Sequence, residues 1–195
     1  MSDYINKLKN ILKKRLSRER YEHSLGTMET MIKLAENYSA DVKKATLIGL
    51  LHDYTKDCSI GQQLKYITKY KIPIQEGEIL APNLHHAITA PVVIKNELGI
   101  DDREILSAIR YHTTAKEKMT QLEKMIYVAD FIEPQRDYQD VNMYRKLAYL
   151  NLDKALFLGL RWNIEKLLKE KDYIHPDSLS AYNSYIIKQI KGENN

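Results

Sequence analysis

The stretch LIGLLHDYTKD, residues 47–57, decides how the rest of this chain can fold. It begins as an apolar run with helical spacing and then presents His52 and Asp53 directly from that run. An imidazole and a carboxylate at the end of a buried helix are costly unless they have a partner, and a metal ion satisfies both. An isolated His-Asp pair is also common in ordinary surface turns, so the surrounding sequence must supply the context.

The composition indicates an all-α protein that folds as one domain over residues 1–195. The chain has 195 residues, of which 44% are hydrophobic, and only 7 Gly and 5 Pro. That length suits a single globular domain. The scarcity of Gly and Pro favours helices over a turn-rich β fold.

The charge and cysteine content limit the partners and the compartment. The net charge of +4, from 30 basic and 26 acidic residues, is compatible with an anionic substrate and too weak to indicate nucleic acid. The apolar runs are shorter than the roughly 20 residues that cross a bilayer, and residues 1–10 lack a secretory core. The single cysteine, Cys58, excludes an internal disulfide and suits a reducing compartment. We therefore expect a cytoplasmic protein that binds neither nucleic acid nor membrane.

Hydrophobic periodicity predicts amphipathic helices along the whole chain. The helix that ends at His52 and Asp53 is expected to be capped by Ser39 or Asp41, and residues 71–82 are expected to form a loop. Proline is tolerated in a first helical turn, so the helix that contains Pro91 is expected to begin near Thr89. The other predicted helices lie at residues 4–18, 20–37, 60–70, from Asp101 or Asp102 to His112, 120–132, 152–171 and 176–191.

The first of these helices, residues 4–18, has a strongly basic outer face. Such a face can bind a membrane or nucleic acid, but it is more typical of a solvated helix packed on the protein body. No cluster of functional residues is evident after residue 141, and His175 stands alone before a proline. We expect this last third to cover the core or to form a homodimer contact.

Several further polar residues lie on the predicted helices at positions that invite a functional interpretation. His23 lies off the apolar stripe of its helix, beside small residues, and Asp130 lies at the border of another stripe. The pair His85 and His86 comes before Pro91, and His112 ends its own helix. Each residue alone has an ordinary alternative, such as a hydrogen-bonded core histidine or a surface carboxylate.

As a set, these residues match the chemistry of a metal site. Several imidazoles with two carboxylates suit a transition metal better than calcium or magnesium, which prefer oxygen ligands. An aspartate placed between two groups of ligands can also bridge two ions.

The order H…HD…H…H…D on successive helices resembles the HD-domain metal-dependent phosphohydrolases. The segments HDYTKD, LHHAITAP, IRYHTT and LEKMIYVADFIEP, followed by Arg136-Asp137, resemble the YqeK family within that superfamily. That family comprises symmetrical bis(5'-nucleosyl)-tetraphosphatases, and the resemblance covers about residues 20–149. It implies one HD-domain helical bundle at about residues 18–135, with a C-terminal helical extension at about residues 140–195.

The resemblance also implies a centre of two transition-metal ions, divalent or mixed-valence. Iron is the expected metal, with manganese, cobalt or nickel as alternatives, and His86 matches the family position better than His85. The implied ligands are His23, His52, Asp53, His86, His112 and Asp130. Hydroxide generated from water would attack an internal phosphorus of diadenosine tetraphosphate and release two ADP. The dinucleoside polyphosphate is thus the expected substrate, and ADP or GDP the expected bound product.

Residues close in sequence to these ligands are candidates for catalysis and substrate binding. Lys56, Arg110 and Arg136 could neutralise phosphate charge. Asp57 could orient a ligand histidine or the attacking water, and with Asp53, Lys56 and Arg110 it completes the predicted catalytic set. Neutral hydrogen-bond donors to the substrate are expected from Thr113 and Thr114.

Two alternative functions remain open from the sequence. The first is a phosphohydrolase of other specificity, acting on nucleoside monophosphates or guanosine alarmones. The second is a nucleotide-binding regulator whose HD site is inactive.

Overall fold

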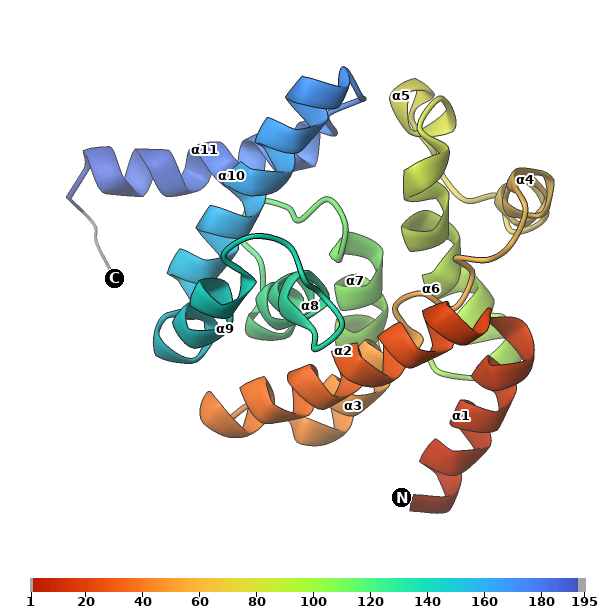
Figure 1. Ribbon diagram of the computed structural model, residues 1–195. Coiled ribbons are helices and arrows are strands. Elements are labelled where there is room, and N and C mark those ends of the chain that lie inside the picture. The colour runs from red at the N-terminus through yellow and green to blue at the C-terminus, as the bar shows by residue number, and fades with distance from the viewer. Residues whose placement is uncertain (1, 193–195) are drawn as a thin grey trace.

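The computed structural model describes residues 2–192, and within that range it contains α-helices and one 3₁₀ turn but no β-strand (Figure 1). This confirms the all-α prediction. The elements are α1 (Ser2–Arg15), α2 (Arg18–Asn37), α3 (Val42–Leu51), α4 (Ile60–Lys69), α5 (Glu76–Ile79), η1 (Pro82–Leu84), α6 (His85–Leu98), α7 (Arg103–Tyr111), α8 (Gln121–Ile132), α9 (Val141–Leu150), α10 (Leu152–Glu170) and α11 (Pro176–Ile190).

Two local predictions differ from the structure around α5 and α6. The segment expected to be a loop contains the short helix α5. Helix α6 begins at His85 and not near Thr89, because the turn that starts at Pro82 continues through Leu84 in helical backbone geometry. Pro91 therefore lies inside the helix and not in its first turn. This extension fixes His85 and His86 on a regular helical turn.

Helix ends elsewhere follow the sequence signals. The side chain of Asp41 caps α3 and that of Asp102 caps α7, so in each pair of candidates the second residue is the cap. Thr120 and Glu123 form the expected capping box at the start of α8. Gly99 ends α6 with a positive φ of 71°.

The first helix packs on the protein body, as the more typical alternative predicts. Leu8 and Leu12 of α1, with Leu16 just after it, are buried in the hydrophobic core, and the lysines of α1 are exposed or partly exposed. In the part of the chain that the structure describes, no helix is both long enough and apolar enough to cross a bilayer.

The α2 and α3 backbones are in close contact at Gly49. A Cβ atom added there would lie 2.6 Å from Met28 Cα and 3.0 Å from Met28 N. Only glycine allows this approach. It brings His23, earlier on α2, toward His52 at the end of α3.

The remaining helices surround this pair. Helix α8 packs against α2, α3, α7, α9 and α10, while α6 packs against α4 and α7. In Figure 1, α9 and α10 lie on one side of the molecule, α4 to α6 lie on the other, and α7 lies between them. The ends of several helices therefore converge near the centre.

We expect Gly49→Ala to lower the free energy of unfolding by about 2 kcal/mol, since the added methyl group meets backbone atoms that cannot move aside independently. Urea denaturation measures this change. Gly61→Ala is the matched control, because a Cβ at that helical position meets nothing within 4 Å. Its stability should be unchanged or slightly higher. Equal stability of the two variants would contradict the close backbone contact.

Candidate metal centre

Five helices or helix ends bring the six predicted ligands to one place. His23 comes from α2, His52 and Asp53 follow α3, and His86 lies in the first turn of α6. The other two are His112, which caps the end of α7, and Asp130 in α8. Five of the six are buried, and the Asp130 side chain is partly exposed at 23%. Polar side chains that are costly to bury are thus gathered at one place, which solvent reaches at Asp130.

The first half of the cluster surrounds His23 Nε2. That atom lies 3.2 Å from His52 Nε2, 3.1 Å from Asp130 Oδ1 and 3.8 Å from Asp53 Oδ2. His52 Nε2 is 3.5 Å from the same Asp53 oxygen. These two histidines and two aspartates could hold one ion between them.

The second half surrounds the other oxygen of Asp53. Oδ1 lies 3.2 Å from His86 Nε2 and 3.7 Å from His112 Nε2, and these two nitrogens are 3.2 Å apart. The two oxygens of one carboxylate therefore face different groups of ligand atoms. Asp53 could therefore contact two ions, one through each oxygen, and its bridging role stays a prediction.

Backbone carbonyls determine which nitrogen of the histidine rings is free. His52 Nδ1 lies 2.8 Å from Gly49 O, and His112 Nδ1 lies 2.7 Å from Ile109 O. A carbonyl oxygen can only accept, so Nδ1 must carry the proton, and Nε2 of a neutral ring presents a lone pair. The Nε2 lone pairs of His52 and His112 point into the cluster, where a metal ion could accept them. The donor set therefore fits a metal centre.

The comparisons with known proteins agree with this geometry. The family model of the HD domain matches residues 20–134, more than half of the sequence. The chain belongs to the HD-domain family. Within it, the chain falls in the branch that contains the symmetrical bis(5'-nucleosyl)-tetraphosphatases.

Two curated relatives and one solved structure cover nearly all of this HD-domain chain. "Bis(5'-nucleosyl)-tetraphosphatase, symmetrical" of Bacillus subtilis is 39% identical over 88% of this chain and 92% of its own length. The protein of that name from Halalkalibacterium halodurans is 37% identical over 92% of this chain and 95% of its own. A crystal structure of a Clostridium acetobutylicum protein, described as a "predicted HD superfamily hydrolase involved in NAD metabolism", matches with a TM-score of 0.90 and 34% identity. It covers 94% of this chain and 97% of that protein.

The pKa values of the groups in this HD-domain cluster are shifted in different directions by burial and by neighbouring charges. Burial lowers the pKa of His52 to about 4, which keeps its ring neutral near pH 7. Burial also opposes the charged form of His23, but hydrogen bonds to Asp130 and Glu133 outweigh it and raise that pKa to about 9. Burial disfavours ionised Asp53, yet the surrounding histidines hold its pKa well below the usual value.

Two of the basic side chains predicted to bind the substrate, Lys56 and Arg136, lie at the cluster. Lys56 Nζ is 3.3 Å from His86 Nδ1, and burial lowers the pKa of this ammonium group. Arg136 donates to Asp130 Oδ1 at 2.7 Å and to the backbone oxygen of that residue at 3.0 Å. Both are close enough to the proposed ligands to meet a bound phosphate.

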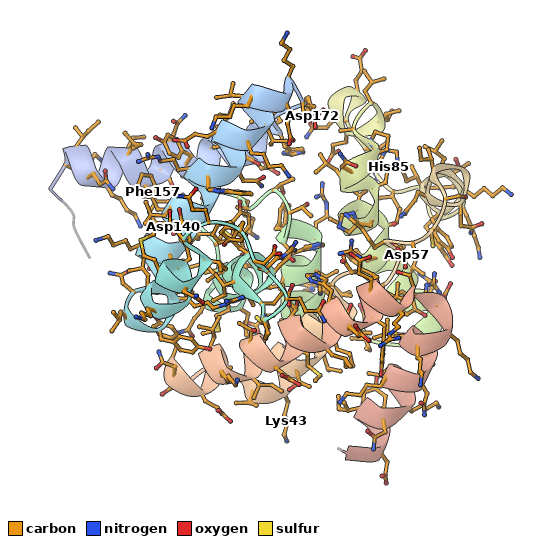
Figure 2. All side chains as sticks on the ribbon, viewed as in Figure 1. Lys43, Asp57, His85, Asp140, Phe157 and Asp172 are labelled. Carbon is orange, nitrogen blue, oxygen red and sulfur yellow. The ribbon has the colours of Figure 1, made fainter. Side chains whose placement is uncertain are left out.

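Arg110 and Asp57 have other contacts. Arg110 donates to Glu78 in α5, and the same carboxylate oxygen lies 3.1 Å from His175 Nε2. Asp57 is exposed, and its carboxylate accepts a hydrogen bond of 2.6 Å from the backbone N–H of Ser17. Figure 2 shows Asp57 near the junction of α1 and α2. The predicted role of Arg110 in catalysis and substrate binding, and that of Asp57 in orienting a ligand histidine or the attacking water, stay predictions.

The two members of each neighbouring pair of candidates, Thr113 with Thr114 and His85 with His86, have different contacts. Thr114 donates to its neighbouring backbone oxygen at Ala115, whereas the buried Thr113 Oγ1 has no hydrogen-bond partner among the described residues. His86 joins the cluster, whereas His85 Nε2 donates to the carbonyl of Glu78 at 3.0 Å (Figure 2). The preference for His86 over His85 thus agrees with the geometry.

Sequence reasoning missed two residues that touch the ligands. Arg20 donates to Asp53 Oδ2 at 2.8 Å, and Glu133 lies 3.1 Å from His23 Nδ1. Each lies three residues from a proposed ligand on or at the end of the same helix, Arg20 before His23 and Glu133 after Asp130. That spacing puts side chains on one helical face and is the signal that could have identified both.

We expect Glu133→Gln to weaken metal binding by roughly 10-fold, because loss of the negative charge at Nδ1 makes His23 a weaker ligand. Competition against a chelator of known affinity measures this change. Glu97→Gln is the control, since that carboxylate bonds to Arg15 and Tyr54 away from the cluster. If both variants bind metal as tightly as the unaltered protein, Glu133 does not support the metal ligand.

Proposed function

We propose that this chain hydrolyses diadenosine tetraphosphate symmetrically to two ADP. The observation that carries the proposal is the match to relatives of that name along nearly the full length of both chains. Three of them are 35–39% identical over 88–93% of this chain. The convergence of all six candidate ligands supports it, because a decayed site would not be expected to retain every one.

In this proposal His23, His52 and Asp130 would hold one ion together with Asp53, and His86 and His112 would hold the other together with the same carboxylate. Two bound ions supply a nucleophile from water at neutral pH and stabilise the charge that develops on phosphoryl oxygens. The Asp53 carboxylate, which is buried, would contact both ions. Arg20 restrains that carboxylate by its hydrogen bond to Oδ2.

Cations at the cluster balance the charge of the substrate. The tetraphosphate brings several negative charges, and the leaving ADP retains some of them. Lys56 beside His86 and Arg136 beside Asp130 lie on opposite halves of the cluster. They are therefore suited to hold the two halves of a substrate that is cleaved at its centre.

Iron is the metal we propose, with manganese, cobalt and nickel as alternatives that a nitrogen and oxygen site accepts. Elemental analysis of anaerobically purified protein identifies the metal.

We also propose a reducing cytosolic location, on the basis of the single Cys58, and homodimer formation through the C-terminal helices. Leu150 and Ile190 in that region are 81% and 80% exposed. Analytical ultracentrifugation tests the dimer.

The activity is tested by product analysis on a nucleotide panel. We expect ADP alone from diadenosine tetraphosphate; release of AMP with ATP would exclude symmetric cleavage. The panel includes nucleoside monophosphates and guanosine alarmones. It also includes NAD, because of the description of the Clostridium protein. If any of these compounds is hydrolysed faster than diadenosine tetraphosphate, that compound is the preferred substrate and the proposed substrate is wrong.

We expect Asp53→Ala to lose most bound metal and nearly all activity, because it removes an oxygen from both halves of the cluster. Circular dichroism should show that the helical content is retained. Metal content equal to that of the unaltered protein would contradict the bridging role of Asp53. Nucleotide binding without metal-dependent turnover in the unaltered protein would favour the regulator alternative.

A further inference from the structure

A cavity of about 220 Å³ opens beside the metal cluster, between α8 and α10. His112 and Asp130 of the cluster form one end of it. The other end contains side chains from α10 and from the segment after α8, among them Tyr138, Trp162 and Lys166. The proposed function uses none of these three residues.

Helices α8 and α10 approach each other closely beside this cavity. A Cβ atom added at Gly159 would lie 3.3 Å from the Phe131 ring and 3.6 Å from that of Tyr127, so glycine lets the two helices pack tightly. One turn further along α10, the Trp162 ring packs 5.4 Å from Phe131 and 5.2 Å from Tyr138, measured between ring centroids. Trp162 is only half-buried, so packing does not cover the whole ring.

We propose that this cavity binds one nucleoside of the substrate, with its base stacked on Trp162. The inference rests on the proposed function and adds to it the residues that recognise the base. Every base has a π face, and an aromatic side chain offers it a surface of low entropic cost. The phosphates attached to this nucleoside then extend toward Asp130 and the metal cluster.

The size of the cavity suits part of the substrate. Pockets that enclose a whole drug-sized ligand measure roughly 300–1,000 Å³, and this cavity is smaller. One nucleoside fits such a space, while the tetraphosphate and the second nucleoside must lie outside it.

Polar groups in the cavity are arranged for the rest of the nucleotide. Thr113 Oγ1 is buried, has no partner within residues 2–192, and lies beside His112, where a phosphate or sugar oxygen would satisfy it. Lys166 Nζ lies 5.8 Å from the Trp162 ring centroid, and Arg136 lines the wall nearest Asp130. Asn163 also lines the cavity and provides an amide that can bond to a base edge.

Intrinsic fluorescence provides a direct test, because Trp162 is the only tryptophan of the chain. We expect ADP to quench the emission of the metal-loaded protein in a saturable manner, while inorganic pyrophosphate at the same concentrations does not. Equal quenching by pyrophosphate would overturn the stacking proposal, because pyrophosphate has no base.

Steady-state kinetics of Trp162 variants provide a second test. Alanine substitution of a stacking aromatic weakens binding by roughly 5- to 150-fold. We expect Trp162→Ala to raise KM for diadenosine tetraphosphate about 10-fold with kcat little changed. Trp162→Phe retains an aromatic face and should recover most of this loss. If the alanine variant fails to fold, the fluorescence test, which uses the unaltered protein, decides the question.

Phe157→Ala is the matched control. Phe157 is another half-buried aromatic residue of α10, but it stacks on Tyr182 outside the cavity, with ring centroids 5.4 Å apart. Its KM should equal that of the unaltered protein. An unchanged KM in Trp162→Ala, or an equal rise in Phe157→Ala, would overturn the proposal and leave the hydrolase activity standing. Absence of hydrolysis in the unaltered protein would instead refute the proposed function, while ADP quenching would still test the cavity.

Discussion

The structure depends on one buried carboxylate that faces two pairs of imidazole nitrogens. Asp53 could not be ionised in a core without compensation, and the histidines around it keep its pKa low. Two of these histidines, His52 and His112, present unprotonated Nε2 atoms to the cluster, because their Nδ1 atoms donate to backbone carbonyls. Such an arrangement is stable when cations occupy the centre. The helices therefore frame a site whose donor set fits a metal.

Close helix packing makes this convergence possible. Gly49 lets α3 touch the α2 backbone, and Gly26 faces the Glu133 carboxylate, where a Cβ would lie 2.8 Å from Oε2. In both cases the absent side chain is the condition for a polar contact nearby. His23 can reach both His52 and Glu133 because Gly49 lets α3 approach α2 on one side and Gly26 lets Glu133 approach α2 on the other.

The C-terminal helices belong to the site as much as to the core. Glu78 in α5 bonds to Arg110 in α7 and to His175 before α11, so one buried carboxylate ties three separate segments together. Tyr173 fills the space beside Gly77, where a Cβ would lie 2.3 Å from its ring, and Figure 1 shows α5 facing the end of α10. Arg110 accordingly acts as a connection between helices, and the extension both braces α5 and supplies one wall of the cavity.

The sequence by itself determined the helices and the types of ligand. Periodicity, the caps at Asp41 and Asp102, and the order of His and Asp residues are local properties, and each is read within one or two turns. The start of α6 could not be read in this way, because Pro91 satisfies the rules for a first turn equally well.

Only the tertiary structure decided which polar residues meet. Arg20, Glu133 and Trp162 lie far from their partners in sequence or look like ordinary surface positions, and Arg110 and Asp57 look functional only by proximity to a ligand. Contacts between residues such as Glu78 and His175, 97 positions apart, depend on how helices pack and not on any local pattern. Side-chain direction across a helix interface is set by that packing. The sequence therefore offered the candidate ligands, and a spacing that marks Arg20 and Glu133, but not the contacts that these two residues make.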